Sequence, residues 1–238
     1  MMIDCISQLA PQNSANPLSQ SQFDFLAHQK DQKKPVNSYM ASHGQDRPMW
    51  FDIYPVQRLM GDATPFGGPF LVDVGGNQGH DLIQFGQKFK YLPGKLILQD
   101  LPNKLSRLSG HDLGIEIMPH NFMDPQPVKG ARVYYFRSIF HDLSDEVCHQ
   151  ILRSTISAMA HDYSRIMIVD FVLPDTDTPL TRVTPEIQKE GIRAGVGRSK
   201  SQWRELLQNA GLEVTGIWNQ DAGMESVIEA IPLSSMTS

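Results

Sequence analysis

The sequence predicts an α/β fold: a mostly parallel sheet with helices on both faces and a C-terminal antiparallel hairpin. Short apolar runs alternate with amphipathic segments through residues 70–195, as they do in repeated strand–helix units. A glycine-rich turn directly follows the first apolar run, where a buried strand gives way to a helix. Near the end of the chain, two strand-like runs are separated by a short loop, which is typical of a hairpin.

Length, charge and cysteine content narrow the classes of protein to consider. A chain of 238 residues suffices for one large α/β domain with a buried core. The net charge of −5 argues against nucleic acid as the main partner, because phosphate groups bind to basic surfaces. The two cysteines, Cys5 and Cys148, fall in a predicted tail and a predicted helix, so a reducing compartment fits better than a disulfide framework. No signal peptide or membrane span is evident, so we expect a cytoplasmic protein, and no metal site is predicted.

Three segments are expected along the chain. Residues 1–45 are rich in Gln, Ser, Asn and Pro and are predicted to form a polar N-terminal arm. Residues 46–232 are predicted to form the folded domain, and residues 233–238 a tail. A dense apolar patch at 49–60, MWFDIYPVQRLM, is expected to pack on the domain as a lead-in helix.

The first half of the domain is predicted to contain three strands, the first two of which lead into helices. Each strand is a short apolar run bounded by turn residues. The loop PHNFMDPQPVKG follows the third strand. In order, the expected elements are a strand at 70–74, a helix near 79–90, a strand at 96–99, a short helix near 102–108 and a strand near 115–118.

The second half continues the alternation and closes with the hairpin. Val147, Ile151, Leu152 and Ile156 recur at helical spacing. Ser199 or Ser201 is expected to cap the helix SKSQWRELLQNAG, which Gly211 ends. The expected elements are a strand at 131–137, a helix near 145–160, a strand at 165–172, helices near 184–195 and from residue 199, and strands near 212–218 and 225–231.

The stretch from Phe70 to Pro102 is the most informative part of the chain. A buried strand, a turn containing Gly75, Gly76 and Gly79, an amphipathic helix and a second strand ending at Asp100 follow one another. Glycines let the backbone approach a ligand closely, and an acid about 20 residues on can accept hydrogen bonds from a ribose. The turn is neither GxGxxG nor a P-loop, so a tight turn without a ligand stays as the alternative. The favoured interpretation is a site for a nucleoside-bearing cofactor.

Two further residues suggest acid–base chemistry at the same edge of the sheet. His141 follows the carboxyl end of the strand at 131–137, and the unperturbed pKa of histidine suits a general base. A surface or structural histidine is the alternative. Asp170 lies inside the apolar run IMIVDFV, where a carboxylate without a partner is costly. His141 is the partner we expect, oriented and polarised by the acid.

In their order and spacing, the glycine turn, the strand ends and the acid–base residues described above resemble the catalytic domain of class I S-adenosylmethionine-dependent O-methyltransferases. The resemblance is to the plant caffeate type and its fungal secondary-metabolism relatives. The resemblance covers about three quarters of the chain, Trp50 to Pro232. The pieces that carry it are LVDVGGNQGHD, LQDLP, HNFMDPQP, YYFRSIFHDLSDEVCHQIL and SQWRELLQNAGL. The resemblance implies a Rossmann-like, seven-stranded methyltransferase sheet that ends in the reversed hairpin.

The resemblance also implies a cofactor, S-adenosyl-L-methionine, and a set of residues around it. The glycine turn would face the methionine part, Asp100 the ribose hydroxyls, and Leu101, Asn121 and Phe122 the adenine. Arg137 would lie near the cofactor. The implied cofactor-binding residues are Asp73, Gly75, Gly76, Gly79, Asp100, Leu101, Asn121, Phe122 and Arg137.

The implied reaction moves a methyl group to a hydroxyl of a small, aromatic or polyketide-like secondary metabolite. His141 would deprotonate that hydroxyl, with Asp170 as its flanking acid. Holding donor and acceptor in contact would supply most of the remaining rate.

Four positions depart from the family pattern. Asn77 stands where a third consecutive glycine is usual, and Asn121 where an acid is usual, although its carbonyl still accepts. Leu143 replaces the tryptophan of His-Asp-Trp, and Gly197 replaces a second acid that flanks the base. The family also carries an N-terminal helical domain that builds a dimer. Here a polar arm precedes Trp50, so we expect a homodimer or partner chain to cover that region.

Two alternatives stay open beside the methyltransferase. One is a methyltransferase-like protein that no longer methylates, acting as a cofactor-binding accessory or a cyclisation catalyst. The departures at Asn77, Leu143 and Gly197 favour it. The other is a dinucleotide-dependent oxidoreductase, which the absence of GxGxxG and of a Tyr-x-x-x-Lys pair disfavours.

Overall fold

The computed structural model describes residues 48–60, 67–106, 114–175, 197–219 and 225–233. A compact unit spans Met49–Ser238. The predicted arm at 1–45, Cys5 and the predicted helix near 184–195 lie outside the described residues, as do the end of the helix near 102–108 and nearly all of the predicted tail.

Strands and helices alternate in the described residues in the predicted order. Their bounds are α4 Trp50–Ile53, the 3-10 helix η2 Val56–Leu59, β1 Pro69–Val74, α5 His80–Lys88, β2 Lys95–Asp100, α6 Pro102–Leu105, β3 Glu116–Pro119, β4 Val133–Arg137, the 3-10 helix η3 Phe140–Asp142, α8 Asp145–Ile156, β5 Arg165–Phe171, α10 Lys200–Asn209, β6 Leu212–Trp218 and β7 Glu225–Pro232.

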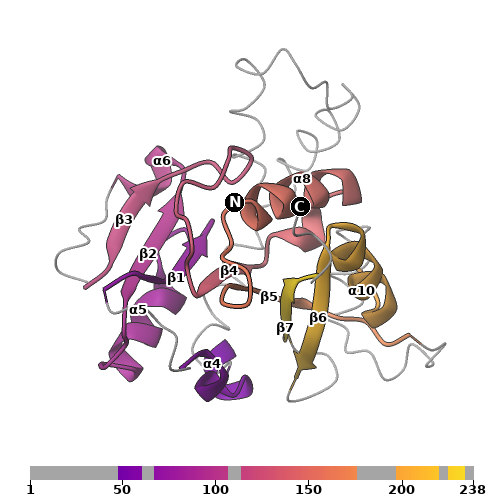
Figure 1. Cartoon of the computed structure of the whole chain (residues 1–238), viewed down its shortest axis with the longest axis horizontal. Coiled ribbons are helices and arrows are strands. Elements are labelled where there is room, and N and C mark those ends of the chain that lie inside the picture. The colour runs from indigo at the N-terminus through magenta and orange to yellow at the C-terminus, as the bar shows by residue number, and fades with distance from the viewer. Residues whose placement is uncertain (1–47, 61–66, 107–113, 176–196, 220–224, 234–238) are drawn as a thin grey trace, which may run out of the picture. The chain divides into compact units, whose positions relative to one another are not determined.

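One seven-stranded sheet organises the unit, with strand order β3-β2-β1-β4-β5-β7-β6 (Figure 1). Pairing is parallel from β3 through β5, and β7 pairs antiparallel with both β5 and β6. The predicted fold class, a seven-stranded and mostly parallel sheet that ends in an antiparallel hairpin, is confirmed. The strand order reverses between β1 and β4, and open α/β sheets bind ligands beyond the carboxyl ends of the strands at such a point.

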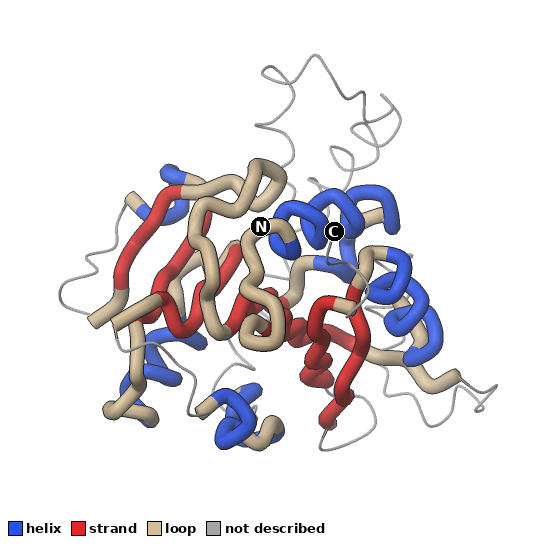
Figure 2. Tube along the Cα trace, in the orientation of Figure 1, coloured by secondary structure: helices blue, strands red, loops and turns tan. Residues whose placement is uncertain are grey.

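Helices cover both faces of the sheet (Figures 1 and 2). Successive side chains of a strand point to opposite faces, so Tyr135 packs toward α4 and α5. Phe136, the next residue, packs in the opposite direction on Phe140, which in turn contacts Trp203 of α10. Both faces of β4 are therefore buried, and its carboxyl end is the part left for a ligand.

The lead-in segment is the main difference from the predicted elements. Instead of one helix over 49–60, α4 ends at Ile53 and η2 begins at Val56. Proline disfavours helical backbone in the residue before it, and Tyr54, which precedes Pro55, is extended with ψ at 135°. The helix is therefore interrupted at Pro55.

The aromatic side chains of this lead-in segment are buried by the chain's own core. Trp50 is 2% exposed and stacks on Phe85 of α5 with ring centroids 5.0 Å apart. Phe51 is also buried and contacts the same ring. The exposed aromatic patch that motivated the expected homodimer or partner chain around Trp50 is therefore not present.

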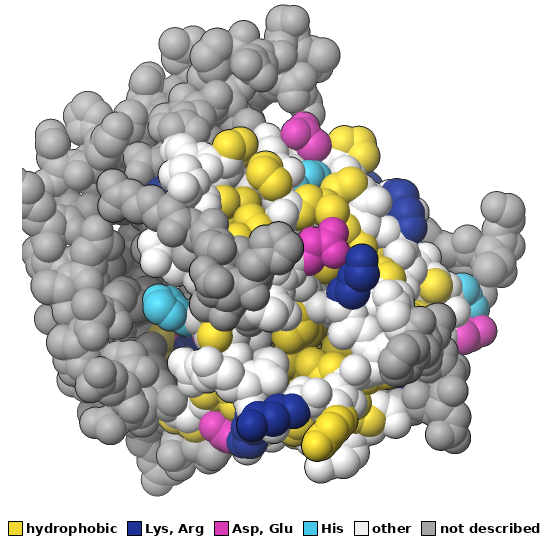
Figure 3. All heavy atoms as spheres, turned by 90° about the vertical axis from the view of Figure 1, so that its left-hand side faces the viewer, with side chains coloured by type: hydrophobic (Ala, Val, Ile, Leu, Met, Phe, Trp, Pro, Cys, Tyr) yellow, Lys and Arg dark blue, Asp and Glu magenta, His cyan; other side chains and the backbone are white. Residues whose placement is uncertain are grey.

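Two further observations concern the helices and the surface of the described part of the chain. None of the helices described there has both the length and the apolar character that crossing a membrane requires. On the face shown in Figure 3, Lys and Arg side chains are scattered rather than gathered into one patch.

Candidate active site

The glycine turn lies at the carboxyl end of β1, packed tightly against its neighbours. Gly75 has φ at +74°, the left-handed region that favours glycine. The N–H groups of Gly75 and Gly76 donate to the carbonyl of Gln99 at 2.8 and 3.1 Å. A Cβ added to Gly76 would lie 2.4 Å from the Asp73 carboxyl group, so only glycine fits there without a shift. The backbone of this glycine turn thus forms the wall of a candidate cofactor site, which is called the cradle below.

Asp100 connects this turn to the end of β2. Its Oδ2 accepts from the Asn77 N–H at 2.7 Å, and its Oδ1 accepts from the Leu101 N–H at 2.7 Å. The residue is only 7% exposed. Each carboxylate oxygen retains a second acceptor position, so the two oxygens are held in place and still able to accept from a diol.

Asn77 adopts the backbone conformation that a glycine would adopt at the same position. Its φ is +53°, in the left-handed region. Among residues with a side chain, asparagine enters that region most readily. The departure from a third consecutive glycine therefore leaves the path of the turn, and the N–H that Asp100 accepts, intact.

Exchanging Asn77 tests this conformational explanation. We expect Asn77→Gly to leave the free energy of unfolding within about 0.5 kcal/mol of the wild type, and Asn77→Ala to lower it by about 1 kcal/mol. Chemical denaturation of the three proteins measures both values. Equal stability of the Ala and Gly variants would contradict the explanation.

Three carboxylates gather around the cradle. Burial raises the pKa of the Asp73 carboxyl well above its ordinary range, the charges of Asp81 and Asp100 raise it further, and Arg137 lowers it. Arg137 donates to Asp81 at 2.7 Å and to Glu225 at 2.6 Å. Because the guanidinium is paired with two acids, the surroundings of the glycine turn remain acidic.

Replacing Asp73 should change how stability depends on pH. The pKa of the Asp73 carboxyl is higher in the folded chain than in the unfolded chain. Between about pH 4 and the raised pKa, the unfolded chain has therefore lost the Asp73 proton while the folded chain still holds it. The folded wild type then binds more protons, and its stability falls as pH rises through the raised pKa. Asparagine does not titrate. The free energy of unfolding of Asp73→Asn, relative to the wild type, is therefore expected to increase from pH 4 to pH 8, as denaturant titrations at both values would measure. A difference that stays constant would contradict the pKa direction.

The loop after β3 brings Asn121 and Phe122 to the same edge. Asn121 Oδ1 accepts from the Met123 N–H at 3.0 Å, which shapes the turn. Phe122 is buried, and a Cβ added to Gly75 would lie 3.6 Å from its ring. A buried pair of amides, Gln99 and Gln126, exchange hydrogen bonds of 2.9 Å in both directions and hold this loop on β2.

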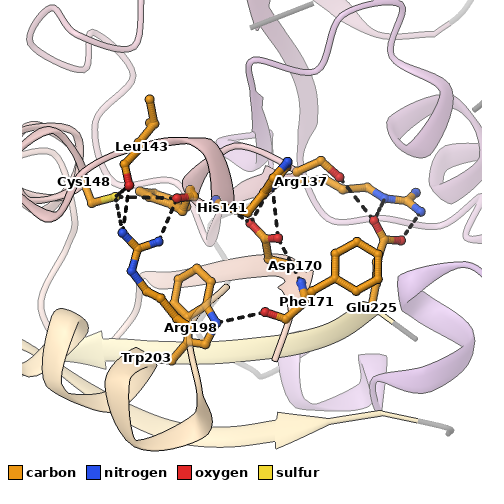
Figure 4. Close-up of polar contacts among 11 residues, drawn as sticks. Arg137, His141, Leu143, Cys148, Asp170, Phe171, Arg198, Trp203 and Glu225 are labelled. Atoms are coloured by element: carbon orange, nitrogen blue, oxygen red, sulfur yellow. Dashed lines mark hydrogen bonds and ion pairs between the residues drawn. The ribbon is translucent and has the colours of Figure 1, made fainter. Parts of the chain in front are cut away.

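His141 and Asp170 are in contact, as expected from the buried acid in an apolar strand (Figure 4). The imidazole Nδ1 lies 3.2 Å from Asp170 Oδ1 and 3.3 Å from Oδ2. The His141 backbone N–H also donates to Oδ2 at 3.2 Å, and the Phe171 N–H donates to Oδ1 at 2.9 Å. Asp170 is fully buried, whereas 18% of the His141 side chain is exposed. The acid is thus fixed from three directions, and the imidazole can be reached from outside.

Comparison with known proteins identifies the family of the chain. A sequence model of the O-methyltransferase domain matches residues 59–213. The chain belongs to the O-methyltransferase domain family. The resemblance noted in the sequence is thereby confirmed.

Relatives of this family member include fungal enzymes. The demethylsterigmatocystin 6-O-methyltransferase of Aspergillus parasiticus is 36% identical over 188 residues, covering 79% of this chain and 48% of that protein. The chain spans about half the length of the curated relatives it matches.

Two solved structures illustrate the similarity in fold. LepI in complex with SAM has a TM-score of 0.71 and 31% identity, covering 89% of this chain and 54% of that one. A structure described as a pericyclic reaction enzyme has a TM-score of 0.71 and 31% identity, covering 89% and 55%.

The contacts of several residues at the site were not predicted from the sequence. Asp81 and Glu225 pair with Arg137 across 56 and 88 residues of chain. Arg198, only 4% exposed, holds the turn that carries His141. Only Asp81 gave a signal, as an acid in the first turn of a predicted helix; the other pairings depend on long-range packing that no local pattern encodes.

Proposed function

We propose that this family member is an S-adenosylmethionine-dependent O-methyltransferase, acting on a hydroxyl of a small, aromatic or polyketide-like secondary metabolite. One observation carries the proposal: His141, just beyond the end of β4, is in contact with Asp170, near the end of β5, and β4 pairs in parallel with β1, which leads into the glycine turn. The aromatic acceptor is suggested by the relative that methylates demethylsterigmatocystin. We also propose 46–232 as the bounds of the catalytic domain.

The residues of the cradle fit this cofactor chemically. The charges of Asp81 and Asp100, only partly offset by Arg137, give the turn a negative potential, which favours the sulfonium and ammonium groups of S-adenosylmethionine. The same charges would repel the pyrophosphate of a dinucleotide. Asp100 has acceptor capacity left for the two ribose hydroxyls, and Phe122 offers an apolar surface to the adenine.

His141 is assigned the role of general base. We place the Nδ1 proton in the hydrogen bond to the Asp170 carboxylate and assign the substrate proton to Nε2. When bound, the cofactor supplies the electrophilic methyl group. Nε2 would take the proton of the hydroxyl that accepts the methyl group, and Asp170 would stabilise the imidazolium that results.

Binding of the cofactor is the first test. Isothermal titration calorimetry with S-adenosylmethionine should give a saturating heat, and titration with NADPH should give none. Heat with NADPH alone would overturn the cofactor assignment.

A second candidate function is a cofactor-binding protein that no longer methylates. Two observations favour it: the similarity to a structure described as a pericyclic reaction enzyme, and a glycine at 197 where a second acid is usual. A panel of phenolic acceptors separates the two candidates. Tight cofactor binding without transfer to any acceptor would favour the second.

A further inference from the structure

We propose that Arg198 is a positioning residue, which holds the turn carrying His141 against the strand end carrying Asp170. The role of that pair rests on the proposed function, whereas the contacts that hold it do not. Arg198 lies on the short segment between Gly197 and α10, and its side chain is only 4% exposed.

The Arg198 guanidinium donates hydrogen bonds to backbone carbonyls on both sides of His141 (Figure 4). Nη1 donates to the Phe140 carbonyl at 2.8 Å, and Nη2 donates to the Leu143 carbonyl at 2.8 Å. These two carbonyls bracket the 3-10 turn at 140–142, which an additional backbone bond from Leu143 N–H to Phe140 closes at 3.2 Å. A shift of the guanidinium would therefore move the backbone from which the imidazole projects.

The charge of Arg198 is balanced locally. Nε and Nη2 both donate to Asp145 Oδ1, at 3.1 and 2.6 Å, at the start of α8. Cys148 also lies 3.5 Å from Nη2, but burial raises the pKa of its thiol to about 12, so the thiol stays neutral. A buried cation with its donors satisfied in this way holds a fixed geometry.

The same residue is anchored to the strand that carries Asp170. The Arg198 carbonyl accepts from the Leu173 N–H at 3.0 Å, just beyond β5. Its guanidinium carbon lies 5.4 Å from the centre of the Trp203 ring, and Trp203 Nε1 donates to the Phe171 carbonyl at 3.1 Å. Phe171 directly follows Asp170. Arg198 thus connects the backbone that presents the base to the backbone that presents the acid.

This connection bears on the departure at Gly197. The family's usual second carboxylate would touch the base directly, and glycine cannot supply it. Arg198, the next residue, contacts the backbone of the turn. Among the described residues, a side-chain acid, Asp170, and the guanidinium that fixes the turn therefore both act on the geometry of the base.

Variants of Arg198 test the positioning role. Arg198→Ala is expected to lower kcat per active site about 100-fold, and Arg198→Lys about 10-fold, because a misplacement of about 1 Å has effects of this size. The Kd of S-adenosylhomocysteine and the KM of the acceptor should change less than about 3-fold, since the cradle does not touch Arg198. Active sites are counted by S-adenosylhomocysteine stoichiometry, and Arg204→Ala, an exposed position on α10, is the matched control.

Two readouts separate positioning from a general structural role. Ethylguanidinium at millimolar concentration should restore part of the activity of Arg198→Ala and leave Arg204→Ala unchanged. NMR titration of the His141 ring, assigned with His141→Gln, should show altered shifts and pKa in both Arg198 variants. If Arg198→Ala does not fold, the kinetic and the NMR measurements are made on Arg198→Lys and Asp145→Asn in its place.

The outcomes keep this proposal distinct from the proposed function. A kcat per active site within about 2-fold of the wild type, together with unchanged His141 signals, would overturn the positioning role. If the wild type transfers no methyl group, the proposed function fails, but the NMR comparison still decides whether Arg198 holds the imidazole.

Discussion

His141→Ala is expected to lower the kcat of methyl transfer by about 10²- to 10⁴-fold, the usual contribution of a general base. The variant lacks the imidazole that Asp170 holds in place, so no positioned base would accept the proton of the substrate hydroxyl. The Kd of S-adenosylhomocysteine should change little, because the imidazole faces Asp170 and not the Asp100 carboxylate. Steady-state kinetics and calorimetry on the same preparation measure both quantities.

The fold should survive this substitution. Asp170 keeps the backbone N–H groups of residues 141 and 171 as donors, so the loss of stability should stay near 1–2 kcal/mol. His161→Ala is the matched control, because His161 lies in a loop with its side chain 40% exposed. Equal kcat values for His141→Ala and the wild type would remove His141 from the mechanism.

Asp100→Ala is expected to weaken cofactor binding about 10- to 100-fold, since hydrogen bonds to a charged acceptor contribute about 1.5–3 kcal/mol. The substitution also leaves the Asn77 and Leu101 N–H groups without their acceptor, so the turn should loosen. Calorimetry with S-adenosylhomocysteine measures the loss. At saturating cofactor, kcat should largely recover, because Asp100 binds rather than reacts.

Glu116→Ala is the control for removing a carboxylate from this part of the sheet. Glu116 begins β3, and its side chain is 44% exposed in an ion pair with Lys95. It should leave the Kd unchanged. An Asp100→Ala protein that binds as tightly as the wild type would show that the cofactor does not contact the end of β2.

The sheet could be predicted from the sequence because its strands are continuous apolar runs. Strands buried on both faces, such as β4 and β5, have few polar positions to obscure them. The lead-in helix was predicted without allowing for Pro55, whose effect on Tyr54 interrupts it. The exposed patch expected around Trp50 was also wrong, since the sequence pattern shows apolar side chains but not which surface buries them.

The candidate site could be predicted only in part. A carboxylate within IMIVDFV needs a partner, and that requirement indicated the contact between Asp170 and His141. Arg198 could not be found in this way, because its partners are backbone carbonyls, which every residue has. Arg137 was placed near the cofactor by resemblance, but its pairing with Asp81 and Glu225 depends on how α5 and β7 pack.

The most direct test of the account is transfer of a labelled methyl group. The wild type and His141→Ala would each be incubated with methyl-labelled S-adenosylmethionine and the panel of phenols, and the products analysed by mass spectrometry. We expect the wild type to place the label on a phenolic oxygen, and His141→Ala to bind the cofactor without doing so. Label transferred equally by both proteins, or by neither while both bind the cofactor, would contradict the account.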